Sequence, residues 1–501
     1  MKKIRTIIAV FLVLTFAVLP TAVFAKDDSN QCPIVDVPGF MSSTLYKDKS
    51  DPNSEVIWPP STDAILDAVK QCVEPIMKVA VDKDWDSLAK SISDIGNNLL
   101  NDALNDNNGN AKGNTGAYFK YPSAASINKN SKVTFRYDWR GDPVKIAADL
   151  NDFINYVLES SGCDKVSIEC HSLGGVITTS YLSIYGNTKI KSVVFNSTAI
   201  YGETYNGELM SGKMRLDSKA VNDYLQYAFD GIEYEALLDS ISEILLKSGV
   251  YSVVCKLGNA FLDKMLLNVA KGVVMPLFGG WLTIWAMIPD EYMADSMKYV
   301  FEDVYGDSEV DHSGLLEKIE SYNKLVREKK TQTLTDLNDV ANVYVISRYG
   351  YSSLPLSQSY FLSSDGVIDT SRTSFGATVA YFGKTLDGEY LSKADPKYIS
   401  PDKSIDASTC LFPEQTWFIK GLKHATNSDA LDEMMDTFAR ADEQATVNTY
   451  AQYPRFLKYS YADDTIVPET ESTPLSFFER IKNAVLDLIK LIKYLLSNII
   501  K

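Results

Sequence analysis

Apolar residues follow two different periods along this chain. Short runs rich in β-branched residues recur, and the stretches between them carry an apolar residue every three to four positions, as amphipathic helices do. One such helix is predicted over 143–160, with Ile146, Leu150, Ile154 and Leu158 on one face. The short runs, each predicted to form a strand, lie at 32–39, 132–137, 166–169, 190–195, 343–347 and 417–419. Strands that alternate with helices of this length predict an α/β fold with a mostly parallel sheet and right-handed crossovers.

The alternation of strands and helices is interrupted once. Over 201–340 the pattern predicts helices alone, and strands resume at Val343. We therefore predict that this segment is a helical cap or lid, inserted into a core whose two parts are 26–200 and 341–470.

A long charge-free stretch lies inside the predicted insertion. Residues 272–289 carry no charged side chain and are numerous enough to be considered as a membrane span. Pro276 and the Gly279-Gly280 pair disfavour a straight spanning helix. Three interpretations follow: a lid or acyl-binding wall that contacts a membrane surface, plain hydrophobic core, or a true span.

The C-terminal segment, 471–501, is predicted to be one amphipathic helix. Its apolar residues are spaced by three and four positions, at Phe478, Ile481, Val485, Leu488, Ile492, Leu495 and Ile499. Basic residues outnumber acidic ones in this helix, although the whole chain is acidic. Three roles stay open: contact of 475–501 with an anionic membrane surface, self-association through the apolar stripe, or packing on the rest of the protein.

The N-terminus predicts export. A basic start, an apolar run and the small residue Ala25 are typical of a signal peptide over 1–25, so we expect a secreted or cell-surface protein. The net charge is −16, and the loss of Lys2, Lys3 and Arg5 with the signal peptide makes it −19. Such an acidic protein is a poor candidate for nucleic-acid binding.

Cysteine and histidine are scarce in this chain. There are six cysteines, with no C-x-x-C pair among them, and three histidines. These numbers argue against a disulfide-rich scaffold and against a zinc site, and we expect neither a metal nor an organic cofactor.

The strongest chemical signal is the hexapeptide Cys-His-Ser-Leu-Gly-Gly at 170–175. It lies between a predicted strand and a predicted helix, and a serine in such a sharp turn is typical of a nucleophile at the top of an α/β sheet. A serine nucleophile needs a histidine base and a carboxylate that orients the base. In chain order, Ser172 is followed by Asp365 or Asp369 after a late strand, and by His424 after the predicted last strand.

The backbone around the serine predicts an oxyanion hole. One N–H donor is expected from Leu173, directly after the nucleophile. The second is expected from Phe40, in the loop that follows Gly39, with Met41 as the alternative. His171 adjoins the serine and cannot also be its base, so we expect it to pack within the turn.

Four stretches carry a resemblance to a known family. They are Val37-Pro38-Gly39-Phe40, Tyr137-Asp138-Trp139-Arg140, His171-Ser172-Leu173-Gly174-Gly175 and, more loosely, Ile284-Trp285-Ala286-Met287-Ile288-Pro289. Together they resemble the lipase and acyltransferase branch of the α/β hydrolases, most of all the lecithin:cholesterol acyltransferase-like family. The turn that begins Asp365-Gly366 also resembles the acid-bearing turn of bacterial lipases, which favours Asp365 over Asp369 as the acid. The chain departs from the family in two places: Cys170 replaces a glycine, and 196–199 lacks the usual Pro-x-x-Gly-Ser step.

The resemblance implies an α/β-hydrolase fold and a defined chemistry. We expect an exported serine carboxyl-ester hydrolase, a lipase or esterase, that forms an acyl-enzyme on lipid or other acyl esters through Ser172, His424 and Asp365. Two alternatives stay open. One is a phospholipid acyltransferase or phospholipase, and the other is a non-catalytic surface protein on a hydrolase scaffold.

Overall fold

The centre of the molecule is an eight-stranded sheet. The computed structural model describes residues 31–82, 85–230, 234–306, 309–470 and 482–490. In spatial order the strands are β15 (Thr465–Pro468), β14 (Phe456–Ser460), β13 (Thr416–Lys420), β8 (Asn342–Tyr349), β7 (Ile190–Asn196), β6 (Val166–His171), β1 (Ile34–Val37) and β5 (Lys132–Thr134). Every neighbouring pair is parallel except β14 and β15. The predicted α/β class with a mostly parallel sheet is confirmed, and the arrangement is compatible with an α/β-hydrolase fold.

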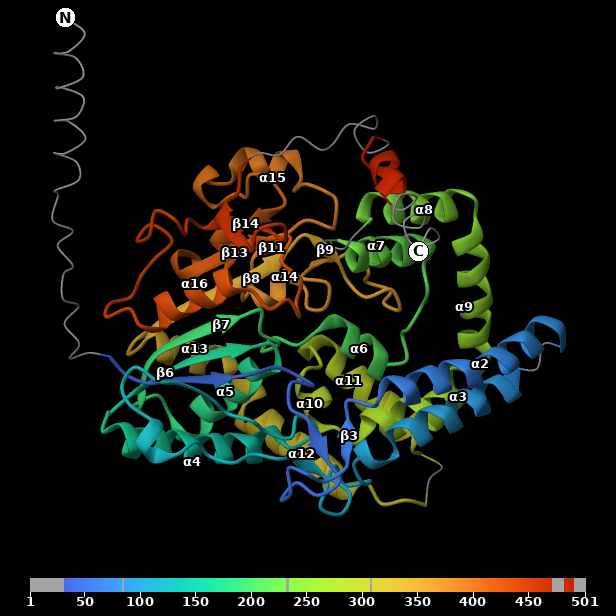
Figure 1. The fold of residues 1–501 in the computed structure, drawn as a ribbon, viewed down its shortest axis with the longest axis horizontal. Helices are drawn as coiled ribbons and strands as arrows, with labels where there is room; N and C mark the ends of the chain where they lie inside the picture. Colours follow the sequence, from blue (N-terminus) through green and yellow to red (C-terminus); the bar gives the residue numbers. More distant parts are fainter. Residues whose placement is uncertain (1–30, 83–84, 231–233, 307–308, 471–481, 491–501) are drawn as a thin grey trace, which may run out of the picture.

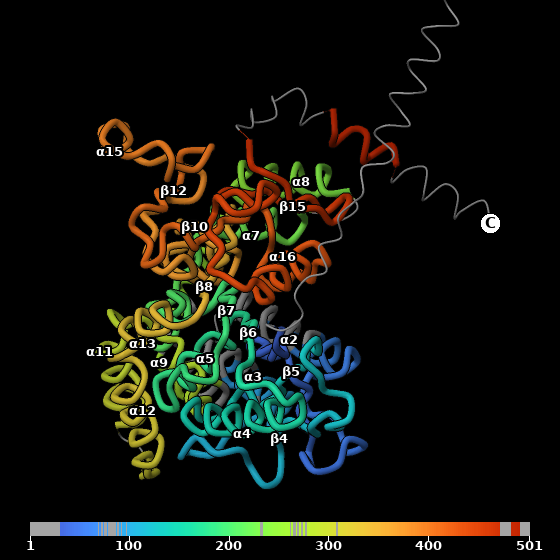
Figure 2. Tube along the Cα trace, turned by 90° about the vertical axis from the view of Figure 1, so that its left-hand side faces the viewer, coloured from blue at the N-terminus to red at the C-terminus, as the bar shows by residue number. Residues whose placement is uncertain are grey.

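Both faces of the sheet are buried because apolar side chains alternate between them. In β8, Val343 and Val345 join the core cluster formed with α4 and α5, whereas Tyr344 and Ile346 join the cluster formed with α16. The helices that flank the sheet are α4 (Pro143–Ser161), α5 (Leu173–Tyr185), α13 (Lys330–Asn338) and α16 (Asp429–Ala439). Figure 1 shows α16 on one side of β6 and β7 and α4 on the other, and in Figure 2 α4 again lies far below α16.

The ends of α4 illustrate how local sequence sets these helices. Asp142 caps its first turn by accepting a hydrogen bond from Val144 N, and Pro143 occupies the first helical position. Gly162 ends the helix with a φ of 69°. The predicted helix over 143–160 therefore differs from the observed one by a single residue at its end.

A helical segment connects β7 to β8. Its helices are α6 (Thr204–Met210), α7 (Ser218–Phe229), α8 (Glu235–Lys247), α9 (Val250–Val269), η4 (Ala270–Gly279), α10 (Leu282–Ala286), α11 (Asp290–Lys298), η5 (Tyr299–Val304), α12 (Ser313–Leu325), η6 (Arg327–Lys329) and the flanking helix α13. Figure 1 shows α9 running from α8 to the paired helices α2 (Thr62–Asp82) and α3 (Trp85–Leu100).

Shorter elements line the connections around the sheet. They are β2 (Leu45–Tyr46), β3 (Val56–Trp58), η2 (Asn101–Ala103), β4 (Gly116–Ala117), η3 (Ala124–Ser126), β9 (Tyr351–Ser352), β10 (Ser363–Ser364), α14 (Thr370–Thr373), β11 (Thr378–Val379), α15 (Gly388–Lys393), η7 (Pro396–Tyr398), β12 (Ile405–Asp406), η8 (Ala407–Thr409) and η9 (Pro413–Gln415). Of these, β9 and β10 form a separate two-stranded sheet, and the turn 365–369 connects β10 to α14.

The prediction that 417–419 is the last strand was wrong. It lies in β13, and β14 and β15 follow it at one edge of the sheet. Both strands were missed because they are short and mixed in polarity. Lys458 is exposed in the middle of β14, and β15 is a partly exposed edge strand that ends in Pro468.

The charge-free stretch 272–289 reaches deep into the protein. Trp281, Leu282, Trp285 and Ile288 are at most 3% exposed and belong to the same core cluster as α4 and α5. This part of the stretch is hydrophobic core, one of the three interpretations considered. Within the described ranges, no helix combines the length and the apolarity that crossing a membrane requires.

Only a short part of the predicted C-terminal helix is described. Residues 482–490 are helical, and Val485 and Leu488 expose 48% and 42% of their surface. Asp487 accepts a hydrogen bond from Ala236 N at 3.2 Å, so this helix contacts the start of α8. The predicted signal peptide, 1–25, and the rest of 471–501 lie outside the described residues.

Candidate active site

Ser172 lies in a sharp turn between β6 and α5. Its φ of 55° and ψ of −123° are unusual for a residue other than glycine. Two glycines allow α5 to approach the strands closely. A Cβ on Gly174 would lie 2.0 Å from the Val37 carbonyl oxygen, and one on Gly175 would lie 2.4 Å from Thr198 Cβ. The close packing of α5 therefore holds Ser172 in its turn.

Three side chains that are distant in sequence form one hydrogen-bonded chain. His424 Nε2 lies 2.9 Å from Ser172 Oγ, and His424 Nδ1 lies 2.6 Å from Asp365 Oδ2. All three residues are buried, with exposures of 7%, 7% and 0% for Ser172, His424 and Asp365. An ionised carboxylate can only accept, so Nδ1 carries the proton and Nε2 accepts from the serine hydroxyl. The structure thus brings together the residues predicted as nucleophile, base and acid.

The carboxylate of Asp365 is held at both oxygens. While Oδ2 faces His424, Oδ1 accepts from Val367 N at 3.0 Å and from Ile368 N at 2.8 Å. Burial opposes ionisation, but the charge and hydrogen bond of His424 and these two N–H groups outweigh it, so the pKa of Asp365 is lowered. The turn needs Gly366, whose φ is 94°.

The alternative acid, Asp369, is directed elsewhere. It is the residue before α14, and its Oδ2 accepts from Thr204 N at 3.3 Å, from the Thr204 hydroxyl and from Arg372 Nε at 3.0 Å. Its carboxylate is therefore engaged by the segment that begins α6 and by Arg372. Of the two predicted candidates, it is Asp365 that contacts His424.

A buried arginine that the sequence reading missed supports the histidine loop. Arg348, 2% exposed in β8, donates from Nη1 to the carbonyls of Lys423 and His424, both at 2.8 Å. Its Nε donates to Asn196 Oδ1 at 3.1 Å. Burial lowers its pKa to about 10, although the negative charge of Asp365 favours the charged form. The signal was a single charged residue near the end of a mostly apolar strand, which is unusual unless the residue is paired.

The predicted oxyanion loop passes beside the serine. A Cβ on Gly39 would lie 2.8 Å from Ser172 Cβ, and Phe40 and Met41 follow directly. On the other side, Leu173 is the first residue of α5, so its N–H has no acceptor within the helix. The roles of Phe40 and Leu173 as donors stay predictions.

The Tyr-Asp-Trp-Arg stretch noted in the sequence supports this loop. The Tyr137 hydroxyl donates to the Pro38 carbonyl at 2.6 Å, and Trp139 Nε1 donates to the Ser43 carbonyl at 3.0 Å. The ring of Phe40 meets Trp139 edge to face, with ring centroids 4.8 Å apart.

His171 packs against the catalytic histidine candidate. Its ring centroid lies 4.6 Å from that of His424. Burial, and next the nearby His424, lower the pKa of His171 well below its ordinary value. A neutral His171 adds no positive charge beside the base.

Helix α7 covers the loops that carry the acid and the histidine. A Cβ on Gly366 would lie 2.2 Å from Tyr227 Cε2, so this ring lies directly on the Asp365 turn. Asp230, after α7, accepts from the Tyr351 hydroxyl through its side chain and from Lys423 Nζ through its carbonyl. The helical segment and the site are therefore in direct contact. Over the described ranges, no group of three or more His, Cys, Asp or Glu side chains is arranged to hold a metal ion.

The chain has a weak similarity to a solved structure. No protein-family model and no curated protein matches the chain. Among the solved structures that match is one titled "The crystal structure of Tle4-Tli4 complex". It is 12% identical, the match covers 63% of this chain and 75% of the other, and the TM-score is 0.25. A TM-score this low carries no conclusion about fold or function, and the family resemblance stays a prediction.

Proposed function

We propose that this protein is an exported serine hydrolase that cleaves carboxyl esters through an acyl-enzyme. The observation that supports it is the hydrogen-bonded chain from Ser172 through His424 to Asp365, with the serine at the N-terminus of α5. A serine nucleophile, a histidine base and a carboxylate that orients the base form the arrangement through which many serine hydrolases work. Export is supported by the predicted signal peptide over 1–25.

The proposed mechanism has two halves. Ser172 Oγ attacks the ester carbonyl while His424 Nε2 takes its proton, and Asp365 stabilises the resulting imidazolium. The N–H groups of Leu173 and Phe40 bind the oxyanion, and the imidazolium then gives its proton to the leaving alcohol. A water molecule, activated by the same histidine, attacks the acyl-enzyme and releases the acid and free Ser172.

The exposed surface of the helical segment favours a lipid ester as substrate. Aliphatic side chains on α8 and α9 are unusually exposed: Ile244 by 64%, Val253 by 59%, Val254 by 56% and Leu257 by 57%. A patch of such residues suits a lipid–water interface. We propose that these side chains of α8 and α9, together with the exposed residues of 482–490, contact the lipid that carries the substrate.

The first experiment labels the nucleophile. A fluorophosphonate probe should modify the purified protein at Ser172, and Ser172→Ala should abolish both labelling and hydrolysis of p-nitrophenyl esters. The matched control is Ser180→Ala in the same helix, whose buried hydroxyl bonds only the Val176 carbonyl, at 2.8 Å. A wild-type protein that is neither labelled nor active on any chain length would contradict the proposal. A product analysis with an added alcohol acceptor separates hydrolysis from acyl transfer.

The second experiment tests the lipid substrate. The double variant Val253→Ser/Leu257→Ser should lose activity on esters presented in phospholipid vesicles while keeping activity on soluble p-nitrophenyl acetate. Val467→Ser is the control, since this residue is 46% exposed on the edge strand β15. If the wild-type protein, the double variant and Val467→Ser were equally active on vesicles, the proposed contact with lipid would be wrong. The proposal of an ester hydrolase would be unaffected.

A further inference from the structure

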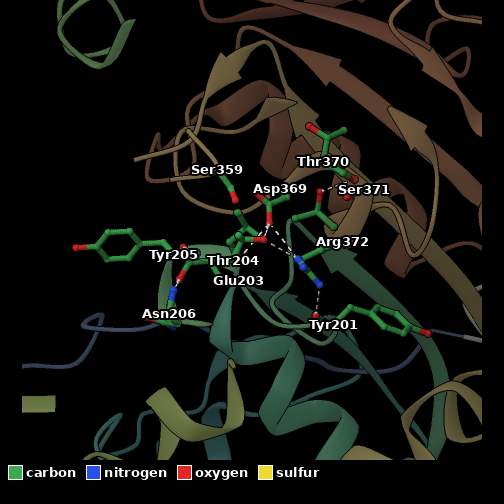
Figure 3. A network of polar contacts seen from close by, with 12 residues as sticks. Tyr201, Glu203, Thr204, Tyr205, Asn206, Ser359, Asp369, Thr370, Ser371 and Arg372 are labelled. Carbon is green, nitrogen blue, oxygen red and sulfur yellow. Dashed lines mark hydrogen bonds and ion pairs between the residues drawn. The ribbon is translucent and has the colours of Figure 1, made fainter. Parts of the chain in front are cut away.

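Arg372 connects the turn that carries Asp365 to the helical segment (Figure 3). Its Nε donates to Asp369 Oδ2 at 3.0 Å and to Thr204 Oγ1 at 3.1 Å. Its Nη1 donates to the Tyr201 carbonyl at 3.1 Å, and its Nη2 pairs with Glu291 of α11. One guanidinium thus holds together α14, the start of α6 and α11.

The network continues into the acid turn through the backbone. Asp369 forms an antiparallel bridge with Ser364, the residue before Asp365. Between these ends, Asp365 N donates to the Ile368 carbonyl at 3.3 Å, and Ile368 N donates to Asp365 Oδ1 at 2.8 Å. A displacement of Asp369 therefore moves Ile368, and both backbone groups of Ile368 contact Asp365.

We propose that Arg372 is a positioning residue for the catalytic acid. By holding Asp369 against Thr204, it fixes the turn in which the Asp365 carboxylate meets His424. This role rests on the proposed function, because it concerns the same three catalytic side chains.

The charges around Arg372 explain why its removal should disturb the turn. Two carboxylates, Glu203 and Asp369, are buried close to it, and burial raises the pKa of both. The oxygens of Glu203 accept from Tyr205 N and Asn206 N, so its side chain caps α6 (Figure 3). Of these two buried carboxylates, it is Asp369 that forms an ion pair with Arg372, whose other ion-pair partner, Glu291, is exposed. Without the guanidinium, a buried carboxylate loses its cation and must take up a proton or move.

The test compares substitutions of Arg372 with one of another buried arginine. Arg372→Gln removes the cation, Arg372→Lys keeps the charge but not the branched geometry, and Thr204→Val removes only the hydroxyl. The control is Arg455→Gln, because Arg455 is 7% exposed and donates to the Pro413 carbonyl and to Glu414. The carboxylate of Glu414 also accepts from Tyr398 and Asn448, which are not among the catalytic side chains.

Kinetics on a soluble p-nitrophenyl ester separate positioning from folding. We expect Arg372→Gln to lower kcat by about 10- to 100-fold with KM changed less than about twofold, as expected for a misplaced catalytic group. The acid limb of kcat/KM against pH should move to lower pH, because the imidazolium loses part of its carboxylate stabilisation. Arg372→Lys should recover part of the loss, and Arg455→Gln should show neither effect.

A spectroscopic readout needs no substrate. The proton between His424 Nδ1 and Asp365 Oδ2, which are 2.6 Å apart, should give a far-downfield resonance in the proton NMR spectrum. We expect this resonance to shift upfield or vanish in Arg372→Gln and to persist in Arg455→Gln. If Arg372→Gln does not fold, Arg372→Lys and Thr204→Val provide the same two readouts with smaller changes.

Two outcomes are distinguishable. If the Arg372 variants lose only thermal stability and keep kcat, the acid limb and the resonance, the arginine is merely structural and the proposal is overturned. If the wild-type protein hydrolyses no ester and is not labelled at Ser172, the proposed function fails. The resonance then still decides whether Arg372 positions the Asp365–His424 pair.

Discussion

Replacing Asp365 by asparagine tests the site with a change of one atom. In the native turn, Oδ1 accepts two backbone N–H groups and Oδ2 accepts the Nδ1 proton of His424. An asparagine has one oxygen for these two tasks. If its oxygen stays on the two N–H groups, its NH₂ group faces His424 and forces the proton onto Nε2. The imidazole then cannot accept the proton of Ser172.

The alternative orientation has a cost that the structure lets us estimate. If the asparagine oxygen turns to His424, the N–H groups of Val367 and Ile368 lose their acceptor beside the buried residues 365 and 368. Two unsatisfied N–H groups cost about 1–3 kcal/mol each, or about 2–6 kcal/mol together. The fraction of enzyme molecules in which His424 Nε2 can accept the Ser172 proton is then reduced by roughly 30-fold to 10⁴-fold. We expect Asp365→Asn to lower kcat by about 10³- to 10⁴-fold, in the upper part of this range.

The assay is steady-state hydrolysis of a short p-nitrophenyl ester, with thermal unfolding to verify that the variant is folded. Asp369→Asn is the matched control, because it makes the same change four residues away in the same turn. It keeps an oxygen for Thr204 and Arg372 and should lose no more than about tenfold. Asp365→Asn with more than a tenth of wild-type activity, or an equal loss in Asp369→Asn, would refute the assignment of Asp365 as the acid.

Three further predictions concern the sheet below the site. Burial raises the pKa of Glu169 to about 8, from an ordinary value of 4.5, although the ion pair with Lys132 at 2.7 Å opposes the shift. The folded protein then retains a proton between these pH values that the unfolded chain releases, so stability falls by up to about 1.4 kcal/mol per pH unit as pH rises. Glu169→Gln should flatten this slope in urea unfolding measured from pH 5 to pH 8, and an unchanged slope would contradict it. Gly174→Ala, whose Cβ would lie 2.0 Å from the Val37 carbonyl oxygen, should destabilise the protein by about 3 kcal/mol in thermal unfolding and abolish labelling of Ser172. Cys170→Gly should cost about 1–2 kcal/mol but leave kcat and chain-length preference unchanged, because Cys170 is fully buried behind the turn; an altered preference would assign it a role in acyl selection.

Much of the sheet could be predicted because each strand carries its own pattern. In β8 the apolar residues occupy both faces, so a continuous apolar run marks a strand that is covered on both sides. Ser172 and His424 could be predicted as site candidates for a similar reason: the serine turn has a local signature, and a chain with three histidines leaves few candidates for the base. The edge strand β15 has no such pattern, since half of it faces solvent.

The contacts that hold the site together could not be predicted in the same way. Arg348 reaches the backbone of a loop 76 residues away, and Arg372 reaches the Tyr201 carbonyl across 171 residues. Neither contact has a sequence period, because each depends on how separate elements pack in three dimensions. A charged residue in an apolar strand indicates that a partner exists, but not which one.

The position of Asp365, the proposed acid, explains why side-chain contacts between distant elements matter in this protein. Ser172 directly follows a central strand, so the register of the sheet largely fixes its place. Asp365 instead follows β10, whose only strand partner among the described residues is β9 in a small separate sheet. A two-residue strand pair supplies little rigidity of its own. The place of Asp365 therefore depends on the backbone hydrogen bonds of its own turn and, in our proposal, on side chains that hold this turn, such as Arg372. It follows that substitutions at the contact between the helical segment and the acid turn should change catalysis more than equally buried substitutions elsewhere in that segment.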